Sequence, residues 1–309
     1  MPNLELNNAN KQLANTLEKK QVSKKSLKLK EIRKNNRNSV KRKILSHLGL
    51  SLVGILFLFP FAWLVLTSVK TADEIFAIPI VWWPEEIQWS NYINSIQKIP
   101  FFQFTWNTIV ICFFSVVGQL LSAPLVAYGL ARINFAGRNF IFIVIIGTMI
   151  LPFQVTMIPV YVLFNKLGML DSFLPLILPN FFGSALYIFM LRQFFLSIPF
   201  ELTESAKIDG ASEFRIYWQI ILPLSRPALY SVALFTFLAS WGDFLGPLIY
   251  LTDPEKWTLS IGLKAFIGEF DVEWGLLMAA STLFTFPIIV LYFFVQRQFI
   301  QGITLTGFK

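Results

Sequence analysis

Five long stretches of this 309-residue chain contain no Asp, Glu, Lys or Arg, and they set the fold class. About 20 apolar residues suffice for a helix to cross the hydrocarbon core of a membrane. The charge-free stretches are residues 44–69, 99–131, 139–165, 172–191 and 274–296, and a shorter one, 227–242, continues past Asp243 to about Tyr250. The sequence therefore predicts an all-α, polytopic membrane protein with six transmembrane helices. We expect these helices near 44–68, 107–131, 140–163, 173–193, 228–250 and 275–297.

The composition supports this class. Hydrophobic residues make up 55% of the chain and charged residues only 14%, too few to cover a soluble domain of this length. Several prolines fall inside or beside the expected spans, where membrane helices tolerate them and often kink. They are Pro60, Pro124, Pro152, Pro159 and Pro179.

Basic residues predict the orientation. The first 43 residues hold 13 of the 26 Lys and Arg, whereas two of the later loops lean acidic. The loops that alternate with these acidic ones carry further basic residues: Arg132 and Arg138 in one, and Arg192, Lys207, Arg215 and Arg226 in the other. Because Lys and Arg concentrate on the cytoplasmic side of membrane proteins, we expect both termini in the cytoplasm. We accordingly divide the chain into a tail, 1–43, and a six-helix transmembrane domain, 44–309, which ends in a tail over 298–309.

The N-terminal tail 1–43 is rich in Lys, Asn and Ser and poor in aromatic residues. It lacks the apolar content to fold alone, so we expect it to be disordered. A basic segment beside a membrane span is attracted to anionic lipid. Membrane lipid is therefore the favoured partner of this tail, and no nucleic-acid partner is expected.

Few residues in the chain offer catalytic or metal chemistry. Cys112 is the only cysteine and His47 the only histidine, and we interpret both as packing residues. Residues of the types that bind metal ions are not clustered in the sequence, so it predicts no metal site. A Walker A run is absent, and no Ser-His-Asp set is recognisable. The sequence therefore predicts a protein that is not an enzyme and binds no cofactor itself.

The loop 197–226 carries helix signals of its own. Ser197 and Pro199 predict the start of a short helix over 200–209, with Ser197 as its cap. Gly210 suits the left-handed position that ends a helix and turns the chain sharply.

A second short helix is expected from about 212 to 222. Its apolar residues recur at helical spacing and predict one apolar face. They are Phe214, Tyr217, Trp218 and Ile221. In the first helix Glu204 and Lys207 are three apart and can pair. On physical grounds the two helices form either a rigid knob that docks into another protein or an amphipathic loop on the lipid surface.

The loop also follows a recurrent pattern. Glu204, Ala206 and Gly210 have the spacing Glu-x-Ala-x-x-x-Gly, and after nine residues the run Ile-x-Leu-Pro ends at Pro223. Other fragments extend the pattern: Leu151-Pro152-x-Gln154, Ile158-Pro159, Leu191-Arg192-Gln193-Phe194-Phe195, Ile208-Asp209-Gly210-Ala211-Ser212 and Ser240-Trp241-Gly242-Asp243-Phe244. Together they resemble the permease subunits of carbohydrate ABC importers over roughly residues 45–309. The tail from Gln301 is similar to that of the maltose-type second permease subunit.

The resemblance implies a fold, partners and a mechanism. It implies a type I ABC importer permease in a bacterial inner (plasma) membrane, working by alternating access. Expected partners are two ATPase subunits that bind ATP and Mg, a second homologous permease subunit and an extracytoplasmic solute-binding protein. The residues that the resemblance places at the ATPase are Glu204, Ser205, Ala206, Asp209, Gly210, Leu222 and Pro223 in the loop, and Gly302, Gly307 and Lys309 in the tail. Ser205 and Gly242 depart from the common residues, Ala and Asn.

Polar and aromatic residues in the spans are the candidates for contacts with substrate. An acidic residue within a span is a functional candidate by default. The candidates are Asp243, Trp241, Gln119, Gln154 and Asn180. Each can instead serve helix packing. Tyr128 is a further aromatic residue that could stack on a sugar ring.

The substrate stays open among disaccharides, oligosaccharides, glycosides, polyols and glycerol phosphate derivatives. Two alternative functions also stay open, a solitary secondary carrier and a membrane anchor that recruits soluble partners.

Overall fold

The computed structural model describes residues 43–268 and 270–306, with side chains as far as residue 296. The chain divides into two units, Met1–Trp63 and Leu64–Lys309. In the first unit the described residues form most of the helix Lys43–Ser68, in which the rings of Phe59 and Trp63 stack with centroids 6.3 Å apart. The tail predicted over 1–43 lies outside the described residues except for Lys43.

The second unit is built from helices. In chain order they are α2 (Ala72–Ile75), α3 (Ser90–Lys98), α4 (Phe101–Arg132), α5 (Arg138–Thr148), α6 (Phe153–Lys166), α7 (Leu174–Ile177), η1 (Leu178–Phe182), α8 (Ala185–Ser197), α9 (Glu201–Ile208), α10 (Glu213–Ile216), η2 (Tyr217–Ile221), α11 (Leu222–Leu224), α12 (Arg226–Trp241), α13 (Leu245–Tyr250), η3 (Pro254–Lys256), α14 (Leu259–Gly262), η4 (Leu263–Phe266) and α15 (Trp274–Thr306). The described residues contain no strand, only an isolated bridge between Ile267 and Val272. The all-α prediction is confirmed.

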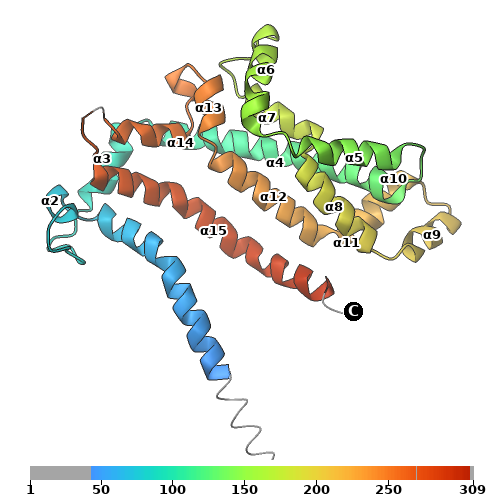
Figure 1. The fold of residues 1–309 in the computed structure, drawn as a ribbon, viewed down its shortest axis with the longest axis horizontal. Coiled ribbons are helices and arrows are strands. Elements are labelled where there is room, and N and C mark those ends of the chain that lie inside the picture. The colour runs from blue at the N-terminus through green and yellow to red at the C-terminus, as the bar shows by residue number, and fades with distance from the viewer. Residues whose placement is uncertain (1–42, 269, 307–309) are drawn as a thin grey trace, which may run out of the picture. The chain divides into compact units, whose positions relative to one another are not determined.

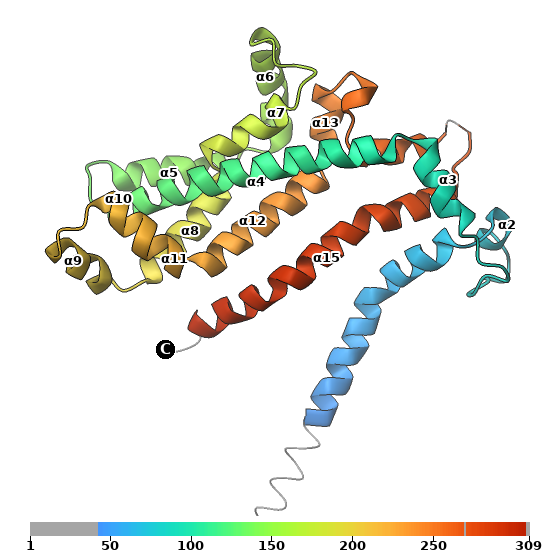
Figure 2. The same cartoon turned by 180° about the vertical axis from the view of Figure 1, so that it is seen from behind.

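Helix α4 lies at the centre of this unit, side by side with α8 and α12, and α15 runs along α12 (Figure 1 and Figure 2). Its buried alanines Ala123, Ala127 and Ala131 are spaced four residues apart and so share one face. Small residues let neighbouring membrane helices approach closely. Leu191 and Phe195 of α8 are fully buried in the same apolar cluster.

Four helices of the described chain are long and apolar enough to cross a membrane. They are Lys43–Ser68, Phe101–Arg132, Leu174–Ser197 and Trp274–Gln296. Two further pairs qualify only if each is counted as one span: α5 with α6, bent by 98°, and Glu213–Leu224 with α12, bent by 78°. The helix predicted over 140–163 is therefore wrong as a continuous element. It breaks before Pro152, because a proline disfavours helical backbone in the residue that precedes it.

The helix predicted over 228–250 is also wrong as a continuous element. Helix α12 ends at Trp241, and Gly242 is its C-cap. Asp243 Oδ1 accepts a hydrogen bond from the backbone N–H of Gly246, at 3.0 Å. A carboxylate that satisfies a free N–H at the start of a helix favours a new start there. The chain accordingly turns at Asp243 and continues as the short helix α13.

The start of α4 holds the segment that follows α13. Asn107 Nδ2 donates to the backbone oxygens of Glu255 and Trp257, at 2.8 and 3.0 Å. Thr108 Oγ1 accepts from the backbone N–H of Leu259, at 2.9 Å. Side chains of α4 thus fix a non-helical backbone whose polar groups would otherwise be unsatisfied.

Candidate functional site

The loop 197–226 forms two arms around a glycine. The first arm is α9, and it ends with Gly210 at φ +77°, as predicted. The N–H of Gly210 donates to the oxygen of Lys207 at 3.0 Å, and the N–H of Ala211 donates to that of Ala206 at 2.9 Å. This pair of bonds is a Schellman motif, which satisfies the last carbonyls of a helix. The turn between the arms is therefore closed by its own backbone.

The residues predicted to contact an ATPase are placed as follows. Glu204, Ser205, Asp209, Gly210 and Pro223 are exposed, Leu222 is half-buried and Ala206 is buried. The exposed residues of the first arm include both of its predicted carboxylates. The surface of α9 that faces away from the bundle therefore carries the acidic part of the motif.

Two details of the first arm differ from the prediction. Ser197 is the last residue of α8, and its Oγ donates to the oxygen of Phe194 at 2.7 Å, so it does not cap α9. Lys207 pairs with Glu213 of the second arm, at 2.6 Å, rather than with Glu204. Both partners of that pair are well exposed, so it adds little to stability.

The second arm consists of α10, the π-helical segment η2 and α11. Its predicted apolar face divides into two. Tyr217 and Ile221 are buried in the bundle. Phe214 and Trp218 instead stack on each other, with centroids 6.4 Å apart, and are 68% and 60% exposed. The apolar arc of this arm is wide enough to pack against the bundle and still leave two aromatic rings free.

The loop therefore exposes an apolar patch, which we define as Ile208, Phe214 and Trp218. Ile208 at the end of the first arm is 86% exposed. Large apolar side chains exposed among polar residues are typical of a surface that binds another protein or a membrane. The patch and the carboxylates of α9 together form the candidate docking site.

Two side chains of α4 hold the loop, and the sequence reasoning did not predict either role. Arg132 is only 6% exposed and donates from Nη2 to the oxygens of Phe195 and Ile198, both at 2.5 Å. Tyr128 donates from its hydroxyl to Glu213 Oε2 at 2.6 Å. The signal in the sequence is that Arg132 directly ends the charge-free stretch 99–131.

Tyr128 does not line the cavity beside Asp243 that is the candidate for a substrate contact. Its ring is buried and lies 5.2 Å from that of Tyr217 in the second arm. A ring packed in this way is not free to stack on a sugar. In this conformation Tyr128 belongs to the loop and its attachment.

Asp243 lies at the break between α12 and α13 and lines a cavity of about 430 Å³. Phe153 and Thr156 of α6 and Pro179 of η1 line the same cavity, which Tyr250 also borders. One oxygen of the carboxylate, Oδ1, accepts a hydrogen bond from the N–H of Gly246. In this cavity an acidic side chain lies beside residues from three interrupted helical segments. The cavity is therefore the best candidate for a substrate contact within the second unit.

The other candidates for substrate contact do not line that cavity. Trp241 is buried and donates from Nε1 to the oxygen of Phe284 at 3.0 Å. Gln119 is buried, and its Oε1 accepts the N–H of Ser184 at the start of α8. Asn180 donates to the oxygen of Leu176. These three therefore serve contacts between or within helices in this conformation.

Gln154 and the tail complete the candidates. Gln154 is exposed on α6. Gly302 lies within α15, which runs on through most of the segment predicted as a tail over 298–309. Gly307 and Lys309 lie outside the described residues.

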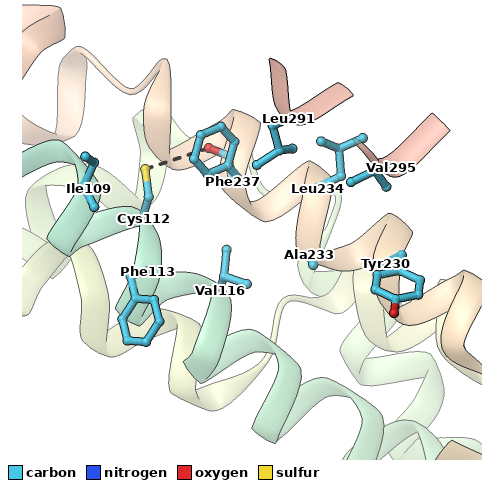
Figure 3. A pocket seen from close by; sticks show the side chains of 10 residues that line it. All are labelled: Ile109, Cys112, Phe113, Val116, Tyr230, Ala233, Leu234, Phe237, Leu291 and Val295. Carbon is cyan, nitrogen blue, oxygen red and sulfur yellow. Dashed lines mark hydrogen bonds between the residues drawn. The ribbon is translucent and has the colours of Figure 1, made fainter. Parts of the chain in front are cut away.

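A second cavity, of about 310 Å³, lies between α4, α12 and α15 (Figure 3). Cys112, Phe237 and Leu291 are among its apolar lining residues, and Tyr230 carries the only side-chain hydroxyl of the lining. Sugars are recognised by several polar groups that bond their hydroxyls. This cavity lacks such groups, so it is not a candidate for sugar recognition.

A small ionic cluster joins the loop before α7 to the loop after α13. Asp171 Oδ1 accepts the N–H groups of Thr252 and Asp253, and its Oδ2 accepts from Lys256 Nζ at 2.8 Å. The hydrogen bond from Lys256 and those from the two backbone groups lower the pKa of Asp171 from 3.8 to about 2. The cluster connects the elements on either side of the Asp243 cavity.

We expect the stability that Asp171 contributes to depend on pH. Because its pKa is lowered on folding, the contribution is complete above pH 3.8 and is lost as the pH falls towards 2. Asp171→Asn should lower the unfolding temperature in mild detergent at pH 7, and its difference from wild type should vanish near pH 2. A difference that stays constant from pH 7 to pH 2 would contradict this account.

Comparisons with known proteins identify the family. Residues 121–305, more than half of the chain, match the family described as binding-protein-dependent transport system inner membrane component. The arabinooligosaccharides transport system permease protein AraQ of Halalkalibacterium halodurans is 34% identical over 266 residues, which cover 85% of this chain and 95% of that protein. The sn-glycerol-3-phosphate transport system permease protein UgpE of Escherichia coli is 34% identical over 269 residues, which cover 84% and 95%.

A solved structure shares the fold. It is a bacterial ABC transporter involved in the import of the acidic polysaccharide alginate, and one of its chains superposes with a TM-score of 0.72 at 25% identity. The match covers 82% of this chain and 95% of that chain. The resemblance to carbohydrate importer permeases drawn from the sequence motifs is thereby confirmed. This chain belongs to the binding-protein-dependent transport system inner membrane components, the permeases of ABC transporters.

Proposed function

We propose that this chain forms half of the translocation path of an ATP-driven importer for a sugar or sugar-like solute. The observation that carries the proposal is the loop 197–226. It is closed by a Schellman turn, is held to α4 and exposes two carboxylates beside an apolar patch. A rigid protruding loop of this kind suits docking to a soluble ATPase subunit. The family to which the chain belongs supports the same role.

The proposed topology has six spans with both termini in the cytoplasm of a bacterium. Four long apolar helices and the bent pair of α5 with α6 would supply five spans, and α12 the sixth, with its bent partner Glu213–Leu224 left in the loop. The loop 197–226, with Lys207, Arg215 and Arg226, would then face the cytoplasm, and the loops poorer in Lys and Arg would face outward. This is a multi-pass arrangement in the inner membrane, with the type I importer fold.

The proposed assembly contains a second, homologous permease subunit, two ATPase subunits and an extracytoplasmic solute-binding protein. ATP and Mg would bind to the ATPase subunits, so this chain would hydrolyse nothing itself. Glu204 and Asp209 would meet basic or backbone donor groups of an ATPase subunit, and Gly302, Gly307 and Lys309 would approach the ATPase dimer. Because the partner subunits would hydrolyse ATP, the role of this chain would be to convert movement of its loop into movement of its helices.

The proposed substrate class is an oligosaccharide or a related glycoside. Curated relatives are described as transporters of arabinooligosaccharides and of sn-glycerol-3-phosphate. The Asp243 cavity offers a carboxylate that could accept hydrogen bonds from hydroxyl groups. Gln119, Gln154, Asn180 and Trp241 are weaker candidates, which would need a different conformation to reach a solute.

The test is affinity purification of the tagged chain from its host in mild detergent. We expect the wild type to bring down an ATPase subunit and a second permease, and to show ATPase activity. Glu204→Lys should lose the ATPase subunit, because the change reverses a charge at the docking site. Glu86→Lys makes the same change on an exposed residue of an acidic loop and should leave the assembly intact.

Other outcomes would favour the alternatives. If the wild type purifies alone yet transports a sugar, a solitary secondary carrier is the better description. If the wild type purifies alone and transports nothing, a membrane anchor is the better description. Equal behaviour of Glu204→Lys and Glu86→Lys in a complete complex would remove the docking role of Glu204.

A further inference from the structure

The last turns of α4 carry two side chains that each hold one arm of the loop. Tyr128 and Arg132 are four residues apart and so lie on the same face of the helix. Tyr128 contacts the second arm through Glu213, and Arg132 contacts the entry to the first arm through Ile198. Their juxtaposition connects both arms of the loop to one continuous helix.

Arg132 is bound in an unusual way for a buried charge. Its Nη2 donates to the backbone oxygens of Phe195 and Ile198, which lie where α8 ends at Ser197 and leaves carbonyls without an i+4 partner in the helix. The oxygen of Phe195 also accepts the N–H of Ile198, at 3.3 Å. Its guanidinium carbon lies 4.2 Å from the centre of the Phe200 ring. A buried charge is costly unless it is paired and hydrogen-bonded. Among the described residues no carboxylate forms an ion pair with it, so these carbonyls, the ring and the hydroxyl of Thr203 in α9, which accepts from Nη1 at 3.5 Å, compensate the charge. The buried Nε has no hydrogen-bond partner in the part of the chain that the structure describes.

The second contact ties the two arms to each other as well as to α4. The Tyr128 hydroxyl and Lys207 Nζ bind different oxygens of Glu213, each at 2.6 Å. Lys207 belongs to α9, and Glu213 is the first residue of α10. A pull on either arm is therefore shared between them and reaches Tyr128.

We propose that Tyr128 and Arg132 are positioning residues that pass the movement of the loop to α4. The proposal rests on the proposed function, because it needs an ATPase that moves the loop. Without the two contacts the loop can still dock, but it can shift without moving the helix. With them the loop and α4 move as one body.

The length of α4 makes this attachment useful. The helix has 32 residues, about 48 Å at 1.5 Å per residue. At its far end Asn107 and Thr108 hold the backbone from Glu255 to Leu259. A displacement received at Arg132 is thus delivered to the segment that follows the Asp243 cavity.

The experiment uses the whole importer, reconstituted in lipid with its binding protein, and measures solute transported per ATP hydrolysed. Arg132→Gln should assemble and hydrolyse ATP, but its transport per ATP should fall by at least about fivefold, the lower end of typical coupling between sites. Arg132→Lys should recover part of the loss, because an ammonium group still donates to carbonyls. Tyr128→Phe removes only the hydroxyl and should give a smaller loss in the same direction.

Arg192 provides the matched control. Its guanidinium carbon lies 3.9 Å from the centre of the Phe142 ring, and its Nε donates to the oxygen of Leu130 at 3.2 Å. It has the same chemistry at the same end of α4, but these two partners lie in α4 and α5 and not in the loop. Arg192→Gln should therefore keep the transport per ATP of the wild type.

Three results would overturn the proposal. One is wild-type transport per ATP in an assembled Arg132→Gln complex. Another is an equal loss in Arg192→Gln, which would indicate general destabilisation. If Arg132→Gln does not assemble, wild-type coupling in both Arg132→Lys and Tyr128→Phe would be decisive against it. Failure of the proposed function is distinguishable, because the wild type itself would then neither recruit an ATPase nor transport.

Discussion

Replacing Gly210 by proline is expected to abolish transport while leaving the helical bundle folded. A proline fixes φ near −65° and has no N–H, whereas Gly210 has φ +77° and donates to the oxygen of Lys207. The Schellman turn cannot form, so the two arms of the loop lose their relative orientation. The bundle should survive, because a Cβ at this position would meet no atom within 4 Å. Transport and co-purified ATPase subunit report the first effect, and unfolding temperature in detergent reports the second.

A graded series at this position separates backbone conformation from side-chain size. Gly210→Ala should cost about 1–2 kcal/mol, because an L-residue is disfavoured in left-handed backbone. Gly210→Asn should be milder, since asparagine tolerates that conformation, although it is the larger side chain. The expected order of transport is therefore Asn above Ala above Pro. If Ala proved milder than Asn, side-chain size rather than the turn would be limiting.

Replacing Gly262 by alanine is expected to destabilise the protein by about 1–3 kcal/mol, the usual cost of overpacking. A Cβ at Gly262 would lie 2.7 Å from Cδ2 of Phe104 and 3.1 Å from Cδ1 of Ile99. Both neighbours are buried, so neither can move into solvent. The contact lies at the start of α4, beside the segment that Asn107 and Thr108 hold. The unfolding temperature in mild detergent should fall accordingly.

Gly129 of α4 is the control, and the opposite sign is expected there. A Cβ at Gly129 would meet no atom within 4 Å. Alanine in a helix interior is favoured over glycine by about 0.5–1 kcal/mol. Gly129→Ala should therefore raise the unfolding temperature slightly. A fall at both positions would show that any methyl group added at a glycine destabilises the bundle, and that the effect is not specific to the close packing at Gly262.

Local rules accounted for the helical class, the apolar segments and the turn at Gly210. Charge-free runs of membrane length need helices, because backbone groups cannot stay unbonded in lipid. Gly210 followed from the same kind of rule, since few residues other than glycine adopt positive φ at a helix end. The motif around Glu204 added the family, because its spacing is itself a local property.

Tertiary structure decided where the helices break and which side chains hold the loop. The sequence around Asp243 is as apolar as the sequence around a residue in the middle of a membrane helix. Only the hydrogen bond from the N–H of Gly246 to its carboxylate shows that a new helix starts there. Arg132 reads in the sequence as one more cytoplasmic cation. Its role depends on carbonyls of α8 that are 63 and 66 residues away along the chain. The sequence by itself thus determined the elements and the family, whereas contacts between distant segments, which no local pattern encodes, decided how the loop is attached to the bundle.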